Sequence, residues 1–475
     1  MKYQLTFEDV TPISISLWRY ILFVVVLKRW CPIRMVAICS LFFLGFSLEA
    51  FAAGHPCCSE DGELSYLLSP RPSQRFHYLV RYETFFSNVL GKEKGFFIIL
   101  PEDFCQNPNA KYPVLSFLHG YNFERRGFWW KVYSPEKAKK VLCEVKEEEY
   151  HWLVHEDIAI IAYAMMDSRN RTYGDLERSL EDRFEELSKY GGLAKGDYQP
   201  KEIAQSIVSF NLHPKGHLAD PIHPVQKMVI LLPDGDNGFY TDENEGKRLF
   251  PKVKNQEACD RFNPAETLNY SLLPFLHMIP GALGKYESYF LEFLHYIESQ
   301  SSYRERLLPK RGLGGLSMGG FGAIKLGLKY PRLFQSLSSQ SGLLDIGLLK
   351  DRLMLTMMMP EFLEVFGRLE SQKLPSGSSL DLKHIQENNP LTLIKRMGIS
   401  QLPHWLYFDY GQKESLEGIT KGNRNFEKAL KEGSHQIPVQ PFNGKSRHNN
   451  QFWRSRSGNV LRHHSDVFQK SDTGK

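Results

Sequence analysis

The chain has 475 residues, of which 42% are hydrophobic and 24% are charged, and its formal net charge is +5. This is the composition of a globular protein with a substantial core, and it excludes a chain that is disordered throughout. The small net charge, without a run of lysine and arginine interleaved with aromatic residues, predicts no nucleic-acid partner.

Residues 1–53 have the layout of an export signal with a long n-region. Basic residues at Lys28-Arg29 and Arg34 precede an apolar run over 35–48, and the small residues that end in Ala53 offer a cleavage site. The apolar run is shorter than the ~18 residues of a membrane span. We therefore expect a secreted or periplasmic protein. The alternative is an uncleaved signal, which would be its only membrane contact.

Residues 54–80 are expected to form an N-terminal extension. Removal of the signal leaves five scattered cysteines, namely Cys57, Cys58, Cys105, Cys143 and Cys259. No CxxC pair occurs among them, so a thiolate zinc site is not expected. In an oxidising compartment, one or two disulfides with an odd thiol left over are the expected outcome.

Residues 81–470 are predicted to form one α/β domain, because strand-like and helical segments alternate along them. An antiparallel hairpin is expected over 81–101, and the apolar run 112–120 is typical of a strand buried on both faces. Further strands are expected over 228–235, 312–316, 334–342 and 404–411, and helices over 286–300 and 423–432. The pattern predicts a mostly parallel central sheet with helices on both faces.

A long charged segment, about residues 125–225, follows the third predicted strand. We expect this large insert to pack as helices over the top of the sheet. Two interpretations remain open: a solvated decoration, or a lid that shapes the substrate pocket. Within it, the apolar residues 158–166 are also compatible with a further strand.

The motif Gly315-Leu-Ser317-Met-Gly319 is typical of a nucleophile elbow, the tight turn between a strand and a helix that exposes a reactive serine. Glycine is needed on both sides because side chains there would collide with the neighbouring strand and helix. An apolar segment over 307–316 precedes the serine, and apolar residues at helical spacing follow it over 321–330. Strand, turn and helix thus occur in the required order.

A serine nucleophile needs a histidine to accept its proton and an acid to orient that histidine, here in the order serine, acid, histidine. His448 lies in a polar loop after the strand-like residues 437–442 and is the predicted base. The loop after the strand over 404–410 offers two acids. Glu414 is preferred because it lies beyond the strand's end, and Asp409 is the alternative.

Two backbone amides are predicted to form an oxyanion hole. Met318 follows the nucleophile, and Tyr121 follows a strand that ends in His119-Gly120. Glycine at 120 permits this loop to approach closely.

Two further histidines, His463 and His464, lie near the C-terminus, and they are assigned to the terminal tail.

The chain resembles the putative esterase family of α/β-hydrolases, which includes feruloyl esterases, S-formylglutathione hydrolases (esterase D), enterochelin esterases and antigen 85 mycolyltransferases. The resemblance is carried by Phe86-Ser-Asn-Val-Leu-Gly, Leu118-His-Gly, Leu232-Pro-Asp-Gly, Tyr286-Glu-Ser-Tyr-Phe-Leu, Gly315-Leu-Ser-Met-Gly-Gly-Phe-Gly-Ala, Asp409-Tyr-Gly and Gly444…His448…Trp453. It implies an α/β-hydrolase fold with the family's nucleophile, acid and base at Ser317, Glu414 and His448. Its oxyanion donors map onto Met318 and Tyr121.

Three features depart from the family pattern. The family commonly has Gly-Gly-His where this chain has Gly444-Lys-Ser-Arg-His448, and it usually has aspartate where this chain has Glu414. The insert is also longer than expected, which weakens any inference about substrate.

The resemblance and the motifs together predict an exported serine esterase that hydrolyses a carboxylic ester or thioester through an acyl-enzyme on Ser317, without a cofactor. The substrate is expected to be a small-molecule, carbohydrate or lipid ester. One alternative is an acyltransferase of the antigen 85 type, which moves the acyl group to a sugar or lipid hydroxyl. A second is a non-catalytic binding protein on a hydrolase scaffold.

Two segments contain residues of metal-ligating types, and neither is preferred as a metal site. His151 and His155 are one helical turn apart, but no third ligand accompanies them and HExxH is absent. The acidic segment 234–245 has Phe239 where a calcium loop requires glycine, so a solvated loop is expected there rather than bound calcium.

Overall fold

The structure is a computed structural model. It describes residues 79–121, 152–189, 200–210, 224–243, 284–351, 381–397, 406–412, 417–433 and 448–470, together with 362, 365–367 and Glu414. All of them belong to one compact unit, Glu63–Lys475. The export signal, most of the extension, the strand expected at 437–442 and all cysteines but Cys105 lie outside the described residues.

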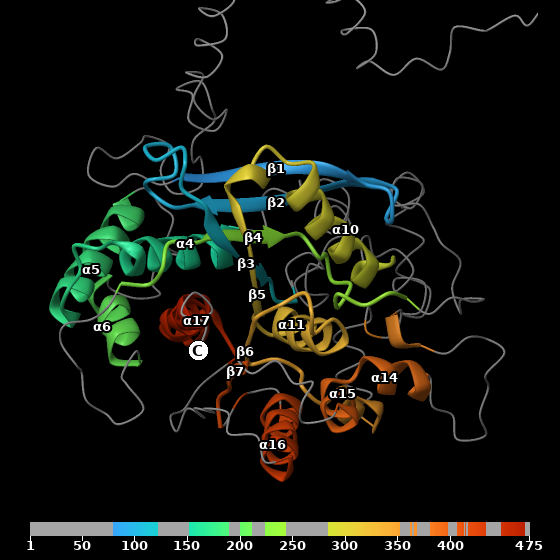
Figure 1. Cartoon of the computed structure of the whole chain (residues 1–475). Coiled ribbons are helices and arrows are strands. Elements are labelled where there is room, and N and C mark those ends of the chain that lie inside the picture. Colours follow the sequence, from blue (N-terminus) through green and yellow to red (C-terminus); the bar gives the residue numbers. More distant parts are fainter. Residues whose placement is uncertain are drawn as a thin grey trace, which may run out of the picture. The chain divides into compact units, whose positions relative to one another are not determined.

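A single seven-stranded sheet, in the order β1-β2-β4-β3-β5-β6-β7, forms the centre of this unit (Figure 1). The strands are β1 (Leu79–Ser87), β2 (Lys92–Leu100), β3 (Tyr112–Leu118), β4 (Val229–Pro233), β5 (Leu307–Gly315), β6 (Ser336–Gln340) and β7 (Leu406–Asp409). β2 pairs antiparallel with both β1 and β4, and the remaining pairs are parallel. The opening hairpin and the mostly parallel sheet are therefore confirmed.

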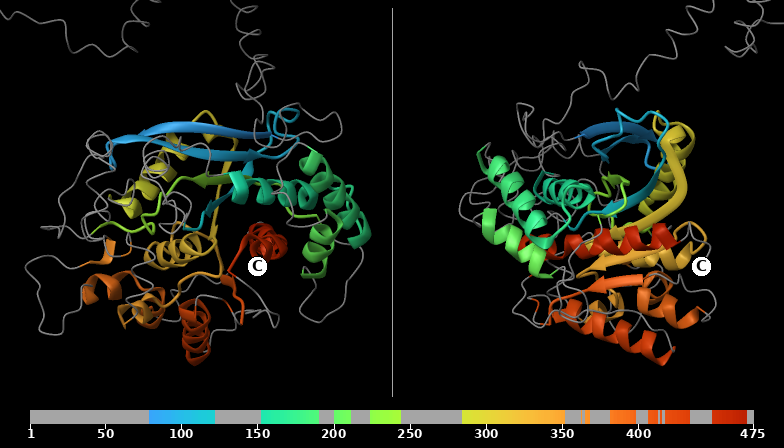
Figure 2. Two further views of the ribbon diagram at one scale, coloured as in Figure 1. Left: turned by 180° about the vertical axis from the view of Figure 1, so that it is seen from behind. Right: turned by 60° about the vertical axis from the view of Figure 1, so that its left-hand side comes forward.

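Helices cover both faces of the sheet (Figure 2). They are α4 (Trp152–Met166), α5 (Tyr173–Lys189), α6 (Pro200–Phe210), α10 (Tyr286–Ser299), α11 (Met318–Lys329), α14 (Leu382–Asn388), α15 (Pro390–Arg396), α16 (Glu417–Glu432) and α17 (Asn450–Lys470). α17 packs on β5 and β6 from one side and contacts α4 and α6, whereas α11 packs on β3, β5 and β6. Among the described residues, none of these helices is long and apolar enough to span a membrane.

The alternation of side chains in β5 and β6 places α11 and α17 on opposite faces. A Cβ at Gly312 would lie 2.6 Å from Nδ1 of His464, which belongs to α17. In β6, Leu337 points to the opposite face of the sheet from Ser336, the residue paired with Gly312. Its side chain fills the space left by the missing side chain of Gly327 in α11. With an elbow between β5 and α11, this mixed sheet confirms the predicted α/β-hydrolase fold.

The imidazole of His464 is fully buried and is hydrogen-bonded at both nitrogens. Nδ1 lies 2.6 Å from Oγ of Ser336, and Nε2 lies 2.8 Å from Oγ of Ser338. The assignment of this residue to a terminal tail is therefore wrong. Its spacing with Leu461 and Phe468, both buried, is helical, and the polar residues between them hid that pattern.

The described part of the insert consists of α4, α5 and α6. Residues 158–166, which are compatible with a strand in sequence, are buried and belong to α4, one of the helices that lie in the chain between the parallel strands β3 and β4. A continuous apolar run does not distinguish a buried strand from a buried helix, which explains the ambiguity. α5 packs on α6, and α6 packs on α17.

A buried ion pair anchors the end of α11 that is remote from Ser317. Nζ of Lys325 donates to Glu287 Oε2 over 2.7 Å and to Oγ1 of Thr241 over 2.9 Å. Burial lowers the pKa of Lys325 to about 8, although Glu287 opposes the shift. For Glu287, burial is outweighed by Lys325 and Lys329, which lower its pKa to about 2.

The buried histidine predicts a pH dependence of stability. Burial, with a smaller effect of His463, holds the pKa of His464 well below its usual range. When the pH falls through about 6.5, the unfolded chain therefore binds a proton at residue 464 that the folded protein does not. The free energy of unfolding should decrease towards acid, by up to about 1.4 kcal/mol per pH unit for one such group.

Urea denaturation between pH 8 and pH 5 checks this expectation. His464→Gln keeps hydrogen-bonding groups but does not titrate, so its stability should fall less steeply over this range. Some slope should remain, because burial also lowers the pKa of His384. Equal slopes for the wild type and His464→Gln would contradict the assignment.

Candidate active site

Ser317 occupies a strained turn between β5 and α11. Its φ of 51° and ψ of −115° are outside the regions that residues with side chains usually adopt. A Cβ at Gly315 would lie 2.7 Å from the carbonyl oxygen of Leu118, and one at Gly319 would collide with the same carbonyl. Gly319 is thus required by the close approach of β3, and Gly315 by that of β3 and of the Gly319 backbone at the start of α11.

His448 lies within hydrogen-bonding distance of Ser317, as predicted from sequence. Its Nε2 is 2.8 Å from Oγ of Ser317. The imidazole stands edge-on to the ring of Trp453, with centroids 4.9 Å apart and planes at 88°. Because Trp453 lies in the first turn of α17, the packing of that helix on the sheet fixes the position of the imidazole.

Glu414 is the acid that contacts this histidine. Its Oε2 lies 2.9 Å from Nδ1 of His448, and its Oε1 accepts hydrogen bonds from Oγ of Ser341 (2.6 Å) and from the backbone N–H of Gly411 (2.7 Å). We call Ser317, His448 and Glu414 the serine-histidine-glutamate chain. The structure brings together the three residues that the sequence assigned to nucleophile, base and acid.

Asp409, the alternative acid, is held elsewhere. Its Oδ2 accepts hydrogen bonds from the hydroxyl of Tyr407 at 2.7 Å and from Nε of Arg456 at 3.3 Å. Burial raises the pKa of Asp409, although Arg456 opposes this shift. Its carboxylate therefore serves to join β7 to α17, and Glu414 occupies the position facing the imidazole.

The two predicted oxyanion donors lie on either side of the elbow. Met318 is the first residue of α11, and the amides of a helix's first turn have no acceptor within the helix. A Cβ at Gly120, the residue before Tyr121, would lie 2.6 Å from Cδ1 of Leu316 and 3.4 Å from Cβ of Ser317. The Gly120–Tyr121 peptide is therefore close to the nucleophile.

His119 holds this peptide in place. Its Nε2 accepts the backbone N–H of Gly235 at 2.9 Å, so the proton of the neutral ring is on Nδ1, which donates to the carbonyl of Gly120 at 2.8 Å. In a trans peptide, the carbonyl and the following N–H point in opposite directions. Fixing the Gly120 carbonyl therefore also fixes the direction of the Tyr121 amide.

The first part of the acidic segment, residues 234–241, is buried, so the expectation of a solvated loop is wrong there. Nζ of Lys94 lies 2.8 Å from Asp234 Oδ2 and 3.0 Å from Asp236 Oδ2, and Nζ of Lys92 lies 3.1 Å from Asp236. Tyr286 also donates to Asp236. Lysines, which the sequence separates from these acids by more than 130 residues, occupy the place that a cation would take.

Within the described part of the chain, no group of three or more potential metal ligands is present. His151 and the side chain of His155 lie outside that part, so the zinc interpretation stays untested.

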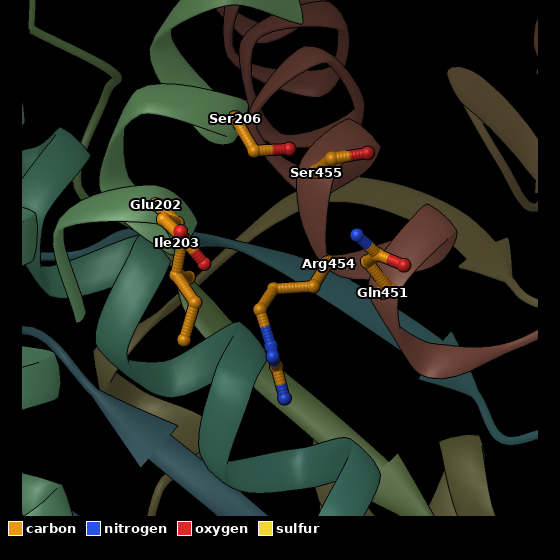
Figure 3. Close-up of a pocket in the computed structure, with 6 residues that line it drawn as sticks. All are labelled: Glu202, Ile203, Ser206, Gln451, Arg454 and Ser455. Atoms are coloured by element: carbon orange, nitrogen blue, oxygen red, sulfur yellow. The ribbon is translucent and has the colours of Figure 1, made fainter. Parts of the chain in front are cut away.

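Figure 3 shows where the insert meets α17. A pocket of about 20 Å³ is lined by Glu202, Ile203 and Ser206 of α6 and by Gln451, Arg454 and Ser455 of α17. This volume is room for about one water. The guanidinium of Arg454 also lies 5.9 Å from the ring centroid of Phe184 in α5. The insert is thus packed against the helix that follows His448, whereas its role as a lid stays a prediction.

Sequence reasoning did not identify two residues of this region. In the sequence, His119 is recognisable only as the end of a strand, and Ser341 is one of four serines in a strand-like run. The role of each depends on a partner more than 70 residues away. A polar side chain directly after a parallel strand, at the edge that carries the nucleophile, is the signal that was available.

Comparison with known proteins supports this picture in part. Residues 284–457 match the model of the putative esterase family, and the predicted resemblance is confirmed over that segment. A search of curated proteins finds no match.

Solved structures similar to this chain include a ferulic acid esterase, which is 18% identical with a TM-score of 0.42, where 82% of this chain and 98% of that one are covered. An S-formylglutathione hydrolase from Agrobacterium tumefaciens is 14% identical with a TM-score of 0.43, where the coverage is 82% and 95%. MPT51 from Mycobacterium tuberculosis is 10% identical with a TM-score of 0.38, where the coverage is 80% and 98%. Structural similarities this weak do not support an assignment of fold or function. The fold is instead assigned from the strand order and the elbow.

The contacts at the elbow predict that Gly319→Ala will not be tolerated. The added methyl group would collide with the Leu118 carbonyl, which is backbone and cannot rotate away. We expect loss of soluble protein or a large fall in melting temperature, measured by expression yield and thermal unfolding. Gly174→Ala is the control, since a Cβ there meets only Thr172 Oγ1 at 3.8 Å. Equal stability of the two variants would contradict the close approach.

Proposed function

Because residues 284–457 match the putative esterase family, we propose that this protein is a serine esterase that acts on a carboxylic ester or thioester. The observation that carries the proposal is the serine-histidine-glutamate chain, with 2.8 Å from Ser317 to His448 and 2.9 Å from His448 to Glu414. The first distance is within the range for proton transfer from a nucleophile to its base, and the second is that of a hydrogen bond from the base to its orienting acid.

In the proposed first step, Oγ of Ser317 attacks the carbonyl carbon of the substrate and its proton passes to Nε2 of His448. The carboxylate of Glu414 accepts the hydrogen bond from Nδ1, so it keeps the imidazole in the tautomer that can accept this proton and stabilises the imidazolium that forms. The negative charge on the former carbonyl oxygen is stabilised by the backbone amides of Met318 and Tyr121.

Collapse of this intermediate expels the alcohol or thiol, which leaves with the proton from His448, and the acyl group remains on Ser317. Water then attacks the acyl-serine and gives a proton to His448. The second intermediate collapses when Ser317 departs and recovers that proton, which releases the carboxylic acid. If an alcohol takes the place of water, the same residues carry out acyl transfer, so the two reactions differ only in the acceptor.

We also propose that the protein is exported. The basic residues and apolar run within residues 1–53 support this, as does a disulfide at Cys105, because disulfides persist mainly in oxidising compartments. The N-terminal sequence of the protein secreted by its native host tests the proposal. It should begin close to residue 54, and a retained first segment would contradict cleavage.

Three substitutions test the catalytic roles. Wild-type protein should be labelled by a fluorophosphonate probe and should hydrolyse p-nitrophenyl acetate, whereas Ser317→Ala should do neither. Glu414→Ala should lower kcat by about 10³- to 10⁴-fold, because the imidazole loses its orienting partner. Asp409→Asn is the matched control: it should lower the melting temperature, with a far smaller effect on kcat.

Product analysis with and without a primary alcohol as acceptor separates hydrolysis from acyl transfer. A wild-type protein that neither labels nor hydrolyses the ester would overturn the catalytic proposal.

A further inference from the structure

The carboxyl end of β6 contacts all three segments that carry the serine-histidine-glutamate chain. The carbonyl of Gln340 accepts the backbone N–H of Ser317 at 2.8 Å. Its side-chain Nε2 donates to the carbonyl of Trp453, in the helix after His448, at 2.9 Å. The next residue, Ser341, donates from Oγ to Glu414 at 2.6 Å.

Ser341 has an unusual backbone for a serine. Its φ is 51°, in the left-handed region where glycine is favoured, and its side chain is fully buried. Its N–H donates to the carbonyl of Asp409 at 2.8 Å, which fixes the residue against the end of β7. The glycine of this segment, Gly342, is one residue further on. The residue in the left-handed conformation is thus the serine and not the glycine beside it. Strain of this kind persists where the surroundings enforce it, and it occurs often at functional sites.

Glu414 has one more rotatable bond than the aspartate that the family usually has, so its carboxylate needs more restraint. Two donors hold the same oxygen, Oε1: the hydroxyl of Ser341 and the N–H of Gly411. With Oε1 fixed from two directions, the second oxygen, Oε2, is directed at Nδ1 of His448. The Gly411 bond alone would leave the carboxylate free to rotate about a single contact.

We propose that Ser341 is a positioning residue, the fourth member of a hydrogen-bonded series Ser341–Glu414–His448–Ser317. It does not touch the substrate. It acts through Glu414, which it holds in the one orientation that keeps the His448 imidazole aligned with the nucleophile. The proposal rests on the proposed esterase activity and extends it to a residue outside the nucleophile, base and acid.

A double-mutant cycle tests this role. Ser341→Ala removes only the hydroxyl oxygen, so kcat for p-nitrophenyl acetate should fall about 10- to 100-fold while KM changes little. In a Glu414→Ala background there is no carboxylate to hold, so the same substitution should change kcat by no more than about twofold. Full additivity of the two substitutions, or a kcat for Ser341→Ala within about twofold of wild type, would overturn the proposal.

Ser338→Ala is the matched control, because it removes a buried hydroxyl from β6, the strand that Ser341 follows, and this hydroxyl bonds to His464 and not to Glu414. The free energy of unfolding of Ser338→Ala should fall by about as much as that of Ser341→Ala. Its kcat should stay at the wild-type value. If Ser341→Ala does not fold, Ser341→Gly relieves the left-handed backbone while removing the same hydroxyl, and the same fall in kcat is expected.

A spectroscopic measurement separates failure of this inference from failure of the esterase proposal. In ¹⁵N-labelled wild-type protein, the Nδ1 proton of His448 should appear as a low-field NMR signal, and it should be lost or shifted upfield in Ser341→Ala but not in Ser338→Ala. This holds even for a wild-type protein without turnover. An unchanged signal in Ser341→Ala would contradict the positioning role whatever the activity.

Discussion

The backbone turn at Ser317 is the constraint on which the site depends. A serine with a φ of 51° is kept in place because its N–H bonds to the end of β6 and because Gly315 and Gly319 let the end of β3 approach closely. The turn places the hydroxyl at the carboxyl edge of the sheet, where loops from neighbouring parallel strands converge. The base and the acid reach the hydroxyl only because the strands hold these loops within hydrogen-bonding distance.

Two ion pairs outside the serine-histidine-glutamate chain keep the supporting elements in register. Lys325 and Glu287 fix the far end of α11, and Asp409 and Arg456 join β7 to α17. Buried pairs of this kind add little net stability, because desolvation offsets their attraction, but removal of one partner leaves a costly unpaired charge. Their effect here is to fix the positions of α11 and α17 relative to the elements that they contact. The Lys325–Glu287 pair ties the helix of the nucleophile to α10, and the Arg456–Asp409 pair ties the helix that follows His448 to the sheet.

Much of this arrangement could be predicted from sequence, because the local signals were strong. The glycines around Ser317, the apolar run of β3 and the helix α11, which ends shortly before Pro331, each depend on neighbours in the chain. Long-range pairing was not predictable. Lys94 neutralises acids that lie some 140 residues away, and His464 looked like part of a tail because polar residues surround it. Strain at one φ leaves no mark on the sequence, so only the place of Ser341 directly after a parallel strand points to a role for it.

The central claim is that an acyl group passes through Ser317. It is tested most directly by mass spectrometry of protein quenched in acid during turnover of p-nitrophenyl acetate, followed by peptide mapping. The peptide that contains Ser317 should gain the mass of one acetyl group, and the gain should be absent from Ser317→Ala. Turnover without any modified Ser317 peptide, or the same modification elsewhere in both proteins, would contradict the claim.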